Sequence, residues 1–275
     1  MVKKIFAFLT VWGLLLPSSQ AEIRHDPALA TLFRNAGVEG QFVLIDAEQD
    51  QTVLSDPAGA QRRFVPASTF KVLNALIAIE LGVVQEDTEV FPWDGKPRFI
   101  KTWERDLTLK EAMAVSAVPV YQELARRIGL DRMGEQVGKA GYGNGMIGTV
   151  VDRFWLDGPL AISATEQAQF LARLRQGTLP FAQQSQERVR RLIPMEAIDG
   201  ARLYGKTGWA MAAQPMVGWY VGWVENGDRV ATFALNMVMK DQNQAPLRKS
   251  LAIDMLRQLG LLDPLAQNTT GATGR

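Results

Sequence analysis

The chain has 275 residues, no cysteine, a single histidine and a formal net charge of +1. The lack of cysteine excludes disulfides, thiolate zinc sites and a lipoprotein anchor, and the near-neutral charge argues against nucleic acid or an anionic membrane as a partner. His25 is close to the N-terminus, where we expect poor order. Ser-His-Asp catalysis, Cys-His catalysis and a metal site are therefore disfavoured, and any nucleophilic chemistry needs another proton acceptor.

The first 21 residues have the order of a secretory signal peptide. Two lysines precede an apolar run at residues 5–16, and "SSQA" supplies small residues before a cleavage site. The run is about a dozen residues, whereas a spanning helix needs ~20. We expect cleavage after Ala21, export to the periplasm without a membrane anchor, one catalytic domain over 22–262 and a disordered tail over 263–275. The sequence favours no particular oligomeric state.

In chain order, the first predicted elements are two strands and a helix. Residues 41–46 ("QFVLID") and 51–54 ("QTVL") predict a strand pair. Apolar residues at helical spacing predict a helix over 68–81, closed by Gly82. The stretch "WDGKP" at 93–97 then predicts a loop.

Two helix-start signals follow. Thr108 with Glu111 matches a capping box that opens a short helix. Pro119 fits the first turn of another helix, which runs to Gly129. Ser116 is therefore expected at a helix–helix junction.

The rest of the chain returns from helix to strand. Ser163 with Glu166 matches a second capping box, for a helix that ends at Gly177. "ARLYGKTGWA", "MVGWYVGWVE" and "DRVATFALNMVM" predict three strands, the last two joined by an Asn-Gly hairpin, and a helix over 246–259 follows. Strands at both ends predict an α/β protein of the α+β type. We expect an antiparallel sheet of N- and C-terminal strands, flanked by helices, with an inserted helical subdomain.

The stretch "PASTFK" places Ser68 and Lys71 three residues apart on one helix face, so the amine can reach the hydroxyl. At a helix start, the N–H of Ser68 is among the unpaired donors, and the helix dipole favours a developing oxyanion. A Ser-x-x-Lys pair nevertheless arises about once by chance in a chain of this length. Alone, the pair favours a helix cap with a surface lysine.

"KTG" at 206–208 changes that balance, because its chance expectation is only about 0.1. It lies in a predicted strand that turns at Gly208, where backbone N–H groups can face a ligand. The alternative is an edge-strand lysine beside a bulge glycine. Ser-x-x-Lys followed far downstream by Lys-Thr-Gly is typical of penicillin-recognising serine acyl enzymes.

Other stretches accompany these two motifs. They are "SAV" (116–118), "YGN" (142–144), "FWLDGPLAIS" (154–163) and "KTGW" (206–209). In this order and spacing they resemble the class D β-lactamases, or oxacillinases, over nearly all of the chain after the leader. The resemblance implies the serine β-lactamase/penicillin-binding fold, hydrolysis of β-lactam antibiotics and antibiotic resistance. "YGN" and Trp155 argue against class A, whose pattern has "SDN" and a glutamate base.

The resemblance also implies catalytic roles. Ser68 would be the nucleophile, and Lys71, carboxylated by carbon dioxide or bicarbonate to a carbamate, the general base that later activates the deacylating water. An apolar pocket favours this modification, because it lowers the pKa of the amine and only the neutral amine reacts with carbon dioxide. The indole N–H of Trp155 would steady the carbamate, and Ser116 would relay a proton to the departing nitrogen. No other cofactor is implied.

Substrate contacts are implied in the same way. The N–H groups of Ser68 and Trp209 would form the oxyanion hole, and Val118 would shield the carbamate. The substrate carboxylate would be held beside Gly208 by three residues: Lys206, Thr207 and Arg248.

Each role has a structural alternative. Trp155 and Val118 could be ordinary core residues. Tyr142 and Asn144 could be plain turn residues, and we expect their motif mainly to shape the site. Arg248 could be a solvated helix arginine.

A finer resemblance concerns substrate range. "KTGWAM", with Met211, is similar to the carbapenem-hydrolysing subgroup, in which a methionine and an aromatic residue bridge over the cleft. The partner position here is Ile100, which is apolar but not aromatic, with Trp103 close by. Hairpin packing of Met211 is the alternative.

Three other functions stay open. A β-lactam sensor domain and a low-molecular-weight penicillin-binding protein would both be acylated without repeated turnover. A periplasmic solute binder would leave Ser68 unlabelled by penicillin.

Overall fold

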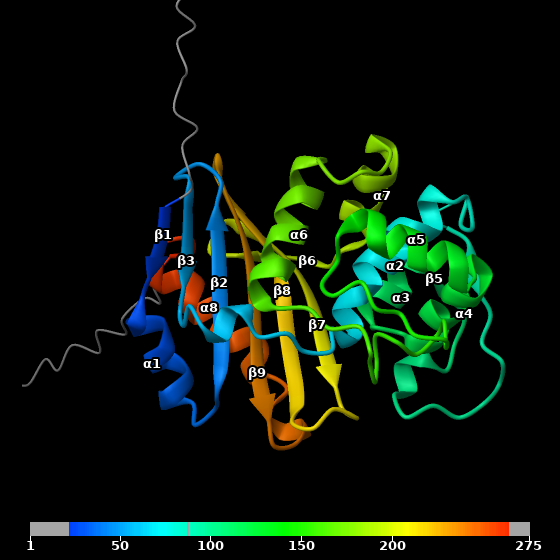
Figure 1. Cartoon of the computed structure of the whole chain (residues 1–275), viewed down its shortest axis with the longest axis horizontal. Coiled ribbons are helices and arrows are strands. Elements are labelled where there is room, and N and C mark those ends of the chain that lie inside the picture. Colours follow the sequence, from blue (N-terminus) through cyan, green and yellow to red (C-terminus); the bar gives the residue numbers. More distant parts are fainter. Residues whose placement is uncertain (1–21, 87, 264–275) are drawn as a thin grey trace, which may run out of the picture.

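The structure is a computed structural model that describes residues 22–86 and 88–263 (Figure 1). The expected signal peptide and nearly all of the expected tail lie outside these residues. Seven strands form the main sheet: β1 (Glu22–His25), β2 (Gly40–Asp46), β3 (Gln51–Leu54), β6 (Met195–Ile198), β7 (Ala201–Ala210), β8 (Met216–Asn226) and β9 (Arg229–Met239).

The strand order is β1-β3-β2-β9-β8-β7-β6, so strands from the two ends of the chain meet in one sheet. β2 pairs antiparallel with β9, and the predicted β2–β3 pair and β8–β9 hairpin are both confirmed. All neighbours are antiparallel except β1, which pairs parallel with β3. The expectation of poor order at His25 was wrong: it lies in β1, and its ring Nε2 is 3.2 Å from the Ser55 carbonyl oxygen.

Eight α-helices are described. They are α1 (Pro27–Asn35), α2 (Lys71–Glu80), α3 (Leu109–Ala114), α4 (Val118–Ile128), α5 (Leu130–Ala140), α6 (Ala164–Gln176), α7 (Gln183–Leu192) and α8 (Leu247–Gln258). Both predicted capping boxes are confirmed, at the starts of α3 and α6. None of the described helices is long and apolar enough to cross a membrane.

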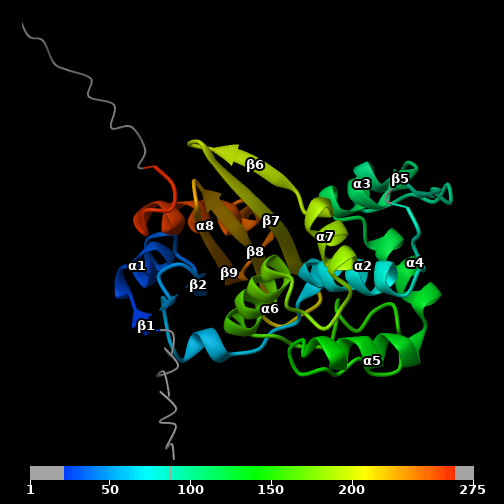
Figure 2. The ribbon, with the colours of Figure 1, turned by 90° about the horizontal axis from the view of Figure 1, so that it is seen from above.

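The helices enclose the sheet on both faces. Seen from above, α1 and α8 lie on one face and α6 on the other, while α2 to α5 form a helical region beside the sheet (Figure 2). Successive strand residues point to opposite faces, so Phe42 and Leu44 pack in the apolar cluster of α1 and α8, whereas Val43 joins the cluster of α2 and α6. The predicted α+β fold with an inserted helical region is confirmed.

α2 occupies the centre of the helical region. Its residues from Lys71 to Ile79 are all buried, as expected of a helix that is apolar on every side. The helix begins later than predicted, because a 3₁₀ turn, η2 (Ala67–Phe70), precedes it. Ser68 thus lies in a tight turn directly before a buried helix.

Candidate active site

Ser68 and Lys71 are in direct contact. Lys71 Nζ donates a hydrogen bond to Ser68 Oγ over 2.6 Å. The lysine side chain is fully buried, and burial, with a smaller contribution from the charge of Lys206, lowers the pKa of Lys71 well below its usual range. The neutral amine, which can accept a proton, is therefore favoured.

The backbone at the two serines is unusual. Ala67, directly before Ser68, has φ of 49°, and Ser116 has φ of 58°. L-residues rarely adopt this left-handed region, so the surrounding packing must hold both turns in place. Ala67 is fully buried, and Ser116 lies between the end of α3 and the start of α4, at the predicted junction.

Lys206 connects this junction to the sheet. Its Nζ donates hydrogen bonds to Ser116 Oγ and to the Thr207 carbonyl oxygen, each over 2.9 Å. Burial, and then the charge of Arg248, lowers the pKa of Lys206 to about 7. Two segments 90 residues apart in sequence thus bring together the hydroxyl of Ser116 and the amine of Lys206, whose charge changes near neutral pH.

β7 passes close to η2 at Gly208. A Cβ at Gly208 would lie 3.0 Å from the Pro66 carbonyl oxygen and 3.1 Å from Thr69 Cγ2. The Trp219 indole also donates to the Val65 carbonyl oxygen over 3.0 Å, which ties η2 to β8. Glycine permits this close approach, because a side chain would require the turn to shift by a few tenths of an ångström.

The backbone N–H of Trp209 points from β7 toward η2. The N–H of Gly205 donates to the Pro194 carbonyl oxygen on the β6 side of β7. N–H groups on one side of a strand recur every second residue, so the N–H of Trp209 also points to that side, beyond the end of β6 and toward η2.

Arg248 lies at the start of α8. Its Nη1 donates to the Gly208 carbonyl oxygen over 2.6 Å and its Nε to the Ala245 carbonyl oxygen over 2.7 Å. Burial lowers the pKa of Arg248 to about 10. The structure therefore places this arginine against the Lys-Thr-Gly strand, in contrast to the solvated alternative.

Trp155 is fully buried beside η2, where its ring stacks on Phe70 with 5.3 Å between centroids. Its indole N–H is buried without a hydrogen-bond partner among the described residues. An unpartnered buried donor is costly, and a carboxyl group on Lys71 would be an acceptor of the kind it lacks. The residues present thus fit a carbamate.

Two polar groups near Lys71 were missed by the sequence analysis. Asn74 Nδ2 donates to the Tyr121 carbonyl oxygen over 3.0 Å, and Lys71 Nζ lies 5.5 Å from the centroid of the Tyr121 ring. The Asn74 Oδ1 and the Tyr121 hydroxyl are buried without partners in the described part of the chain. The signal for Asn74 was its place three residues after Lys71, on the same helix face.

The remaining predicted residues lie around these groups. Val118 is the first residue of α4, and Trp103 donates its indole N–H to the Val115 carbonyl oxygen over 2.9 Å. Ile100 and Met211 are exposed, with 36% and 48% of their surface accessible.

The "YGN" stretch has a structural part. Asn144 Oδ1 accepts hydrogen bonds from the N–H groups of Met146 and Ala161, while its Nδ2 donates to the Pro159 carbonyl oxygen. These bonds hold two loops together, as expected of a motif that shapes the site.

A serine–lysine pair before a buried helix, a second serine at a helix junction and a Lys-Thr-Gly strand define the class of penicillin-recognising serine proteins. In agreement, residues 41–257 match the family described as the penicillin binding protein transpeptidase domain. The chain belongs to the class D β-lactamases within this class, as its relatives show.

Two curated relatives illustrate the similarity. The chain is 41% identical to beta-lactamase OXA-10 of Pseudomonas aeruginosa over 95% of its own length and 99% of that protein. It is 40% identical to beta-lactamase OXA-48 of Klebsiella pneumoniae over 92% and 95%. Among solved structures, the class D beta-lactamase FUS-1 (OXA-85) of Fusobacterium nucleatum subsp. polymorphum matches with a TM-score of 0.84 and 38% identity, over 86% of this chain and 99% of that one.

Proposed function

We propose that this chain hydrolyses the β-lactam amide of penicillins and related antibiotics through an acyl-enzyme on Ser68, and so confers resistance. The observation that carries this proposal is the 2.6 Å hydrogen bond between Lys71 Nζ and Ser68 Oγ, on a lysine whose burial favours the neutral amine. Membership of the class D β-lactamases supports it.

In acylation, Ser68 Oγ attacks the lactam carbonyl carbon and gives its proton to the base at Lys71. The N–H groups of Ser68 and Trp209 stabilise the negative charge on the carbonyl oxygen. The C–N bond then breaks, and the nitrogen takes a proton from Ser116, which Lys206 Nζ resupplies through its 2.9 Å hydrogen bond. Before deacylation, the proton held at Lys71 returns through Ser116 to Lys206. Water then attacks the ester carbonyl and gives a proton to the free base, which passes it to Ser68 Oγ as the ester C–O bond breaks.

The base at Lys71 is proposed to be the N-carboxylated amine. When present, this group supplies a carboxylate-like oxygen that can accept the proton of Ser68 and later that of water. Trp155 would hold it through the indole N–H, which otherwise has no partner in the described structure. Labelled bicarbonate gives a direct test: a carbamate carbon signal in the ¹³C NMR spectrum of the enzyme, absent in Lys71→Ala, is expected.

The substrate carboxylate is proposed to bind beside β7. Lys206 and Arg248 supply positive charge next to Gly208, and Thr207 supplies a hydroxyl at the open edge of the strand. A buried pair of cations is costly when empty, so a bound carboxylate would relieve their repulsion.

The test is to count turnovers of benzylpenicillin per enzyme and to follow the mass of the protein by mass spectrometry during the reaction. Many turnovers, with a transient ester on Ser68 that is lost in Ser68→Ala, are expected. A stable adduct after one equivalent would instead support a sensor domain or a penicillin-binding protein. Absence of any adduct would contradict the acyl-enzyme reaction and favour a solute binder.

The leader and the balance of charge support a periplasmic enzyme without a membrane anchor or nucleic acid partner. Release of the activity by osmotic shock would agree with this location, and activity that stays with the membrane fraction would contradict it.

Carbapenem hydrolysis is a second proposal, supported by the exposed apolar side chains of Met211 and Ile100. Such side chains can cover a bound antibiotic. The proposal fails if the purified enzyme leaves imipenem intact over hours.

A further inference from the structure

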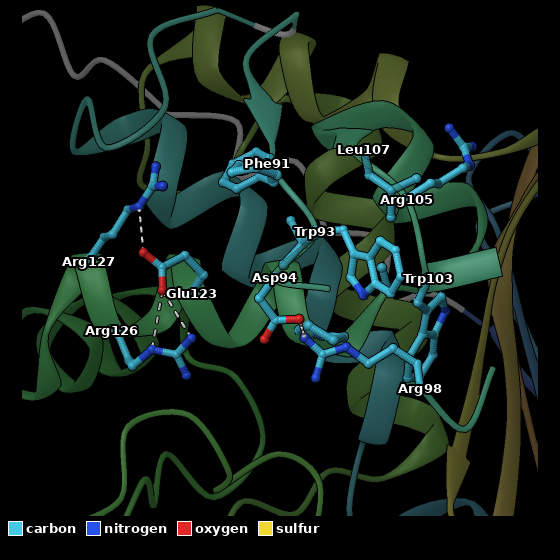
Figure 3. Close-up of a pocket in the computed structure, with 14 residues that line it drawn as sticks. Phe91, Trp93, Asp94, Arg98, Trp103, Arg105, Leu107, Glu123, Arg126 and Arg127 are labelled. Atoms are coloured by element: carbon cyan, nitrogen blue, oxygen red, sulfur yellow. Dashed lines mark hydrogen bonds and ion pairs between the residues drawn. The ribbon is translucent and has the colours of Figure 1, made fainter. Parts of the chain in front are cut away.

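A cavity lies in the helical region beside the candidate active site, and Trp103 and Ala117 are among its lining residues. Its volume is about 260 Å³, and it lies between α4 and the segment 91–107, which includes the short strands β4 (Val90–Phe91) and β5 (Leu107–Thr108) (Figure 3). None of the described residues that line it is Ser68, Lys71, Lys206 or Arg248. The cavity therefore needs its own explanation.

The apolar part of the lining includes three aromatic rings. The rings of Phe91, Trp93 and Trp103 line it, together with Leu107 and Val120. Both tryptophans are held in place: the Trp93 indole donates to the Lys96 carbonyl oxygen and the Trp103 indole to the Val115 carbonyl oxygen, each over 2.9 Å. Fixed aromatic faces favour a flat ring as the ligand.

The polar part of the lining consists of charged side chains, and three of its arginines also pair with carboxylates outside the lining: Arg105 with Glu111, Arg126 with Asp152 and Arg127 with Glu89. Two carboxylates, Asp94 and Glu123, face four guanidiniums: Arg98, Arg105, Arg126 and Arg127. Figure 3 shows Glu123 between the last two arginines and Asp94 beside the first.

Arg98 has a buried donor that is unused among the described residues, whereas the Arg127 side chain is partly exposed. Arg98 binds Asp94 through Nη2 over 2.6 Å, but its Nε is buried without a partner in the described part of the chain. Arg127 uses Nε on Glu123 and Nη1 on Glu89, and no bond of its Nη2 is found among the described residues. A buried N–H of a cation without an acceptor is costly, and an anion would satisfy it.

We propose that this cavity is a binding site for a small aromatic carboxylate, with the ring against Trp93 and Trp103 and the carboxylate on the guanidinium of Arg98. The volume suits such a ligand, since an apolar cavity of about 150 Å³ is enough to hold benzene. The proposal does not depend on β-lactam hydrolysis.

Benzoate is the probe for the test, and protein NMR is the readout. The chain has seven tryptophans, so the indole N–H signal of Trp93 can be assigned with Trp93→Phe. A saturable shift of this signal with a Kd of about 1 mM is expected. The Trp209 indole signal separately reports benzoate bound beside Lys206 and Arg248.

Two variants should change the affinity for benzoate in opposite directions. Misfolding would only weaken binding, so it cannot explain both results. Arg98→Gln should weaken binding about 10-fold or more, because the carboxylate loses a charged partner. Glu123→Gln should strengthen it several-fold, because a competing negative charge is removed; hydrogen bonding from Arg127 lowers the pKa of Glu123, so this group is ionised at neutral pH. Arg34→Gln, on the distant α1, is the matched control and should have no effect.

Benzamide, the neutral analogue, should not shift the Trp93 signal. Three results would overturn the proposal: an unmoved Trp93 signal at about 20 mM benzoate, an equal response to benzamide, or benzoate shifts confined to Trp209.

Discussion

Lys71 carries its amine on a helix that is buried on every side, so the protein holds an ionisable group where charge is unfavourable. The same burial lowers the pKa of Lys71 and so favours the neutral amine, the form that reacts with carbon dioxide. Under the proposed function, Trp155, with its unpartnered indole N–H, would stabilise the product. The buried amine of Lys71 and the unpartnered N–H of Trp155 would each destabilise the fold alone, and in the proposed function they act together.

At the residue scale, Trp155→Phe isolates the contribution of this N–H. The substituted ring can still pack on Phe70 and Phe154, so the fold should be retained. Loss of a hydrogen bond to a charged group should raise the bicarbonate concentration needed for half-maximal penicillin turnover about 10- to 100-fold. Turnover titrated with bicarbonate measures this, and an unchanged midpoint would contradict the assigned role.

The pH dependence should follow Lys206. Its pKa of about 7 means that it loses its positive charge, and its attraction for the substrate carboxylate, as the pH rises through about 7. The kcat/KM for benzylpenicillin should therefore fall on the alkaline side. In Lys206→Arg, which keeps its charge, the fall should move to higher pH. A profile identical in both proteins would contradict this account.

The same shift affects stability. The pKa of an unfolded lysine is ~10.4, so between about pH 7 and that value the unfolded state binds more protons. Lys206 should make the free energy of unfolding rise with pH across this window.

At the element scale, the close approach of β7 to η2 positions the nucleophile. Gly208→Ala would place a methyl group 3.0 Å from the carbonyl oxygen of Pro66, directly before η2, and 3.1 Å from Trp219 Cβ. The turn must move by a few tenths of an ångström, and we expect kcat for benzylpenicillin to fall about 10- to 100-fold.

Gly138→Ala is the matched control. Gly138 is exposed on α5, and a Cβ there meets no atom within 4 Å. It should leave kcat unchanged and stabilise the protein by up to ~1 kcal/mol. Equal kcat in wild type and Gly208→Ala would show that the approach of β7 to η2 is not needed for catalysis.

Local signals predicted part of the fold, although the helices α1, α5 and α7 were not predicted. Both capping boxes, the Asn-Gly hairpin and the helix start at Pro119 depend on neighbouring residues, and all were confirmed. The strands β1 and β6 were missed, because each is a four-residue edge strand whose pairing depends on a partner elsewhere in the chain. The turn at Ala67–Phe70 was assigned to the helix, because apolar spacing does not separate a 3₁₀ turn from an α-helix start.

For the site, sequence reasoning predicted only contacts between residues that are close in sequence. The contact of Ser68 with Lys71 follows from their spacing. The contact of Lys206 with Ser116 joins a sheet edge to a helix junction, and only the family resemblance suggested it. The unpartnered indole of Trp155 was visible only in the packed structure.

At the scale of the whole molecule, the sheet joins the two ends of the chain. β2 pairs with β9 along its full length, and bonds such as Trp219 to Val65 tie the sheet to the start of the helical region. We therefore expect residues 22–262 to unfold as one domain. Calorimetry should give a single transition with equal calorimetric and van't Hoff enthalpies; two separated transitions would show independent domains.

The most direct test of the account is the rate of benzylpenicillin hydrolysis by the enzyme depleted of carbon dioxide, before and after bicarbonate is added, beside Lys71→Ala. The account predicts slow turnover that bicarbonate restores in the wild type and not in the variant. Full turnover without bicarbonate, or a variant that still turns over penicillin, would contradict a carboxylated Lys71 as the general base.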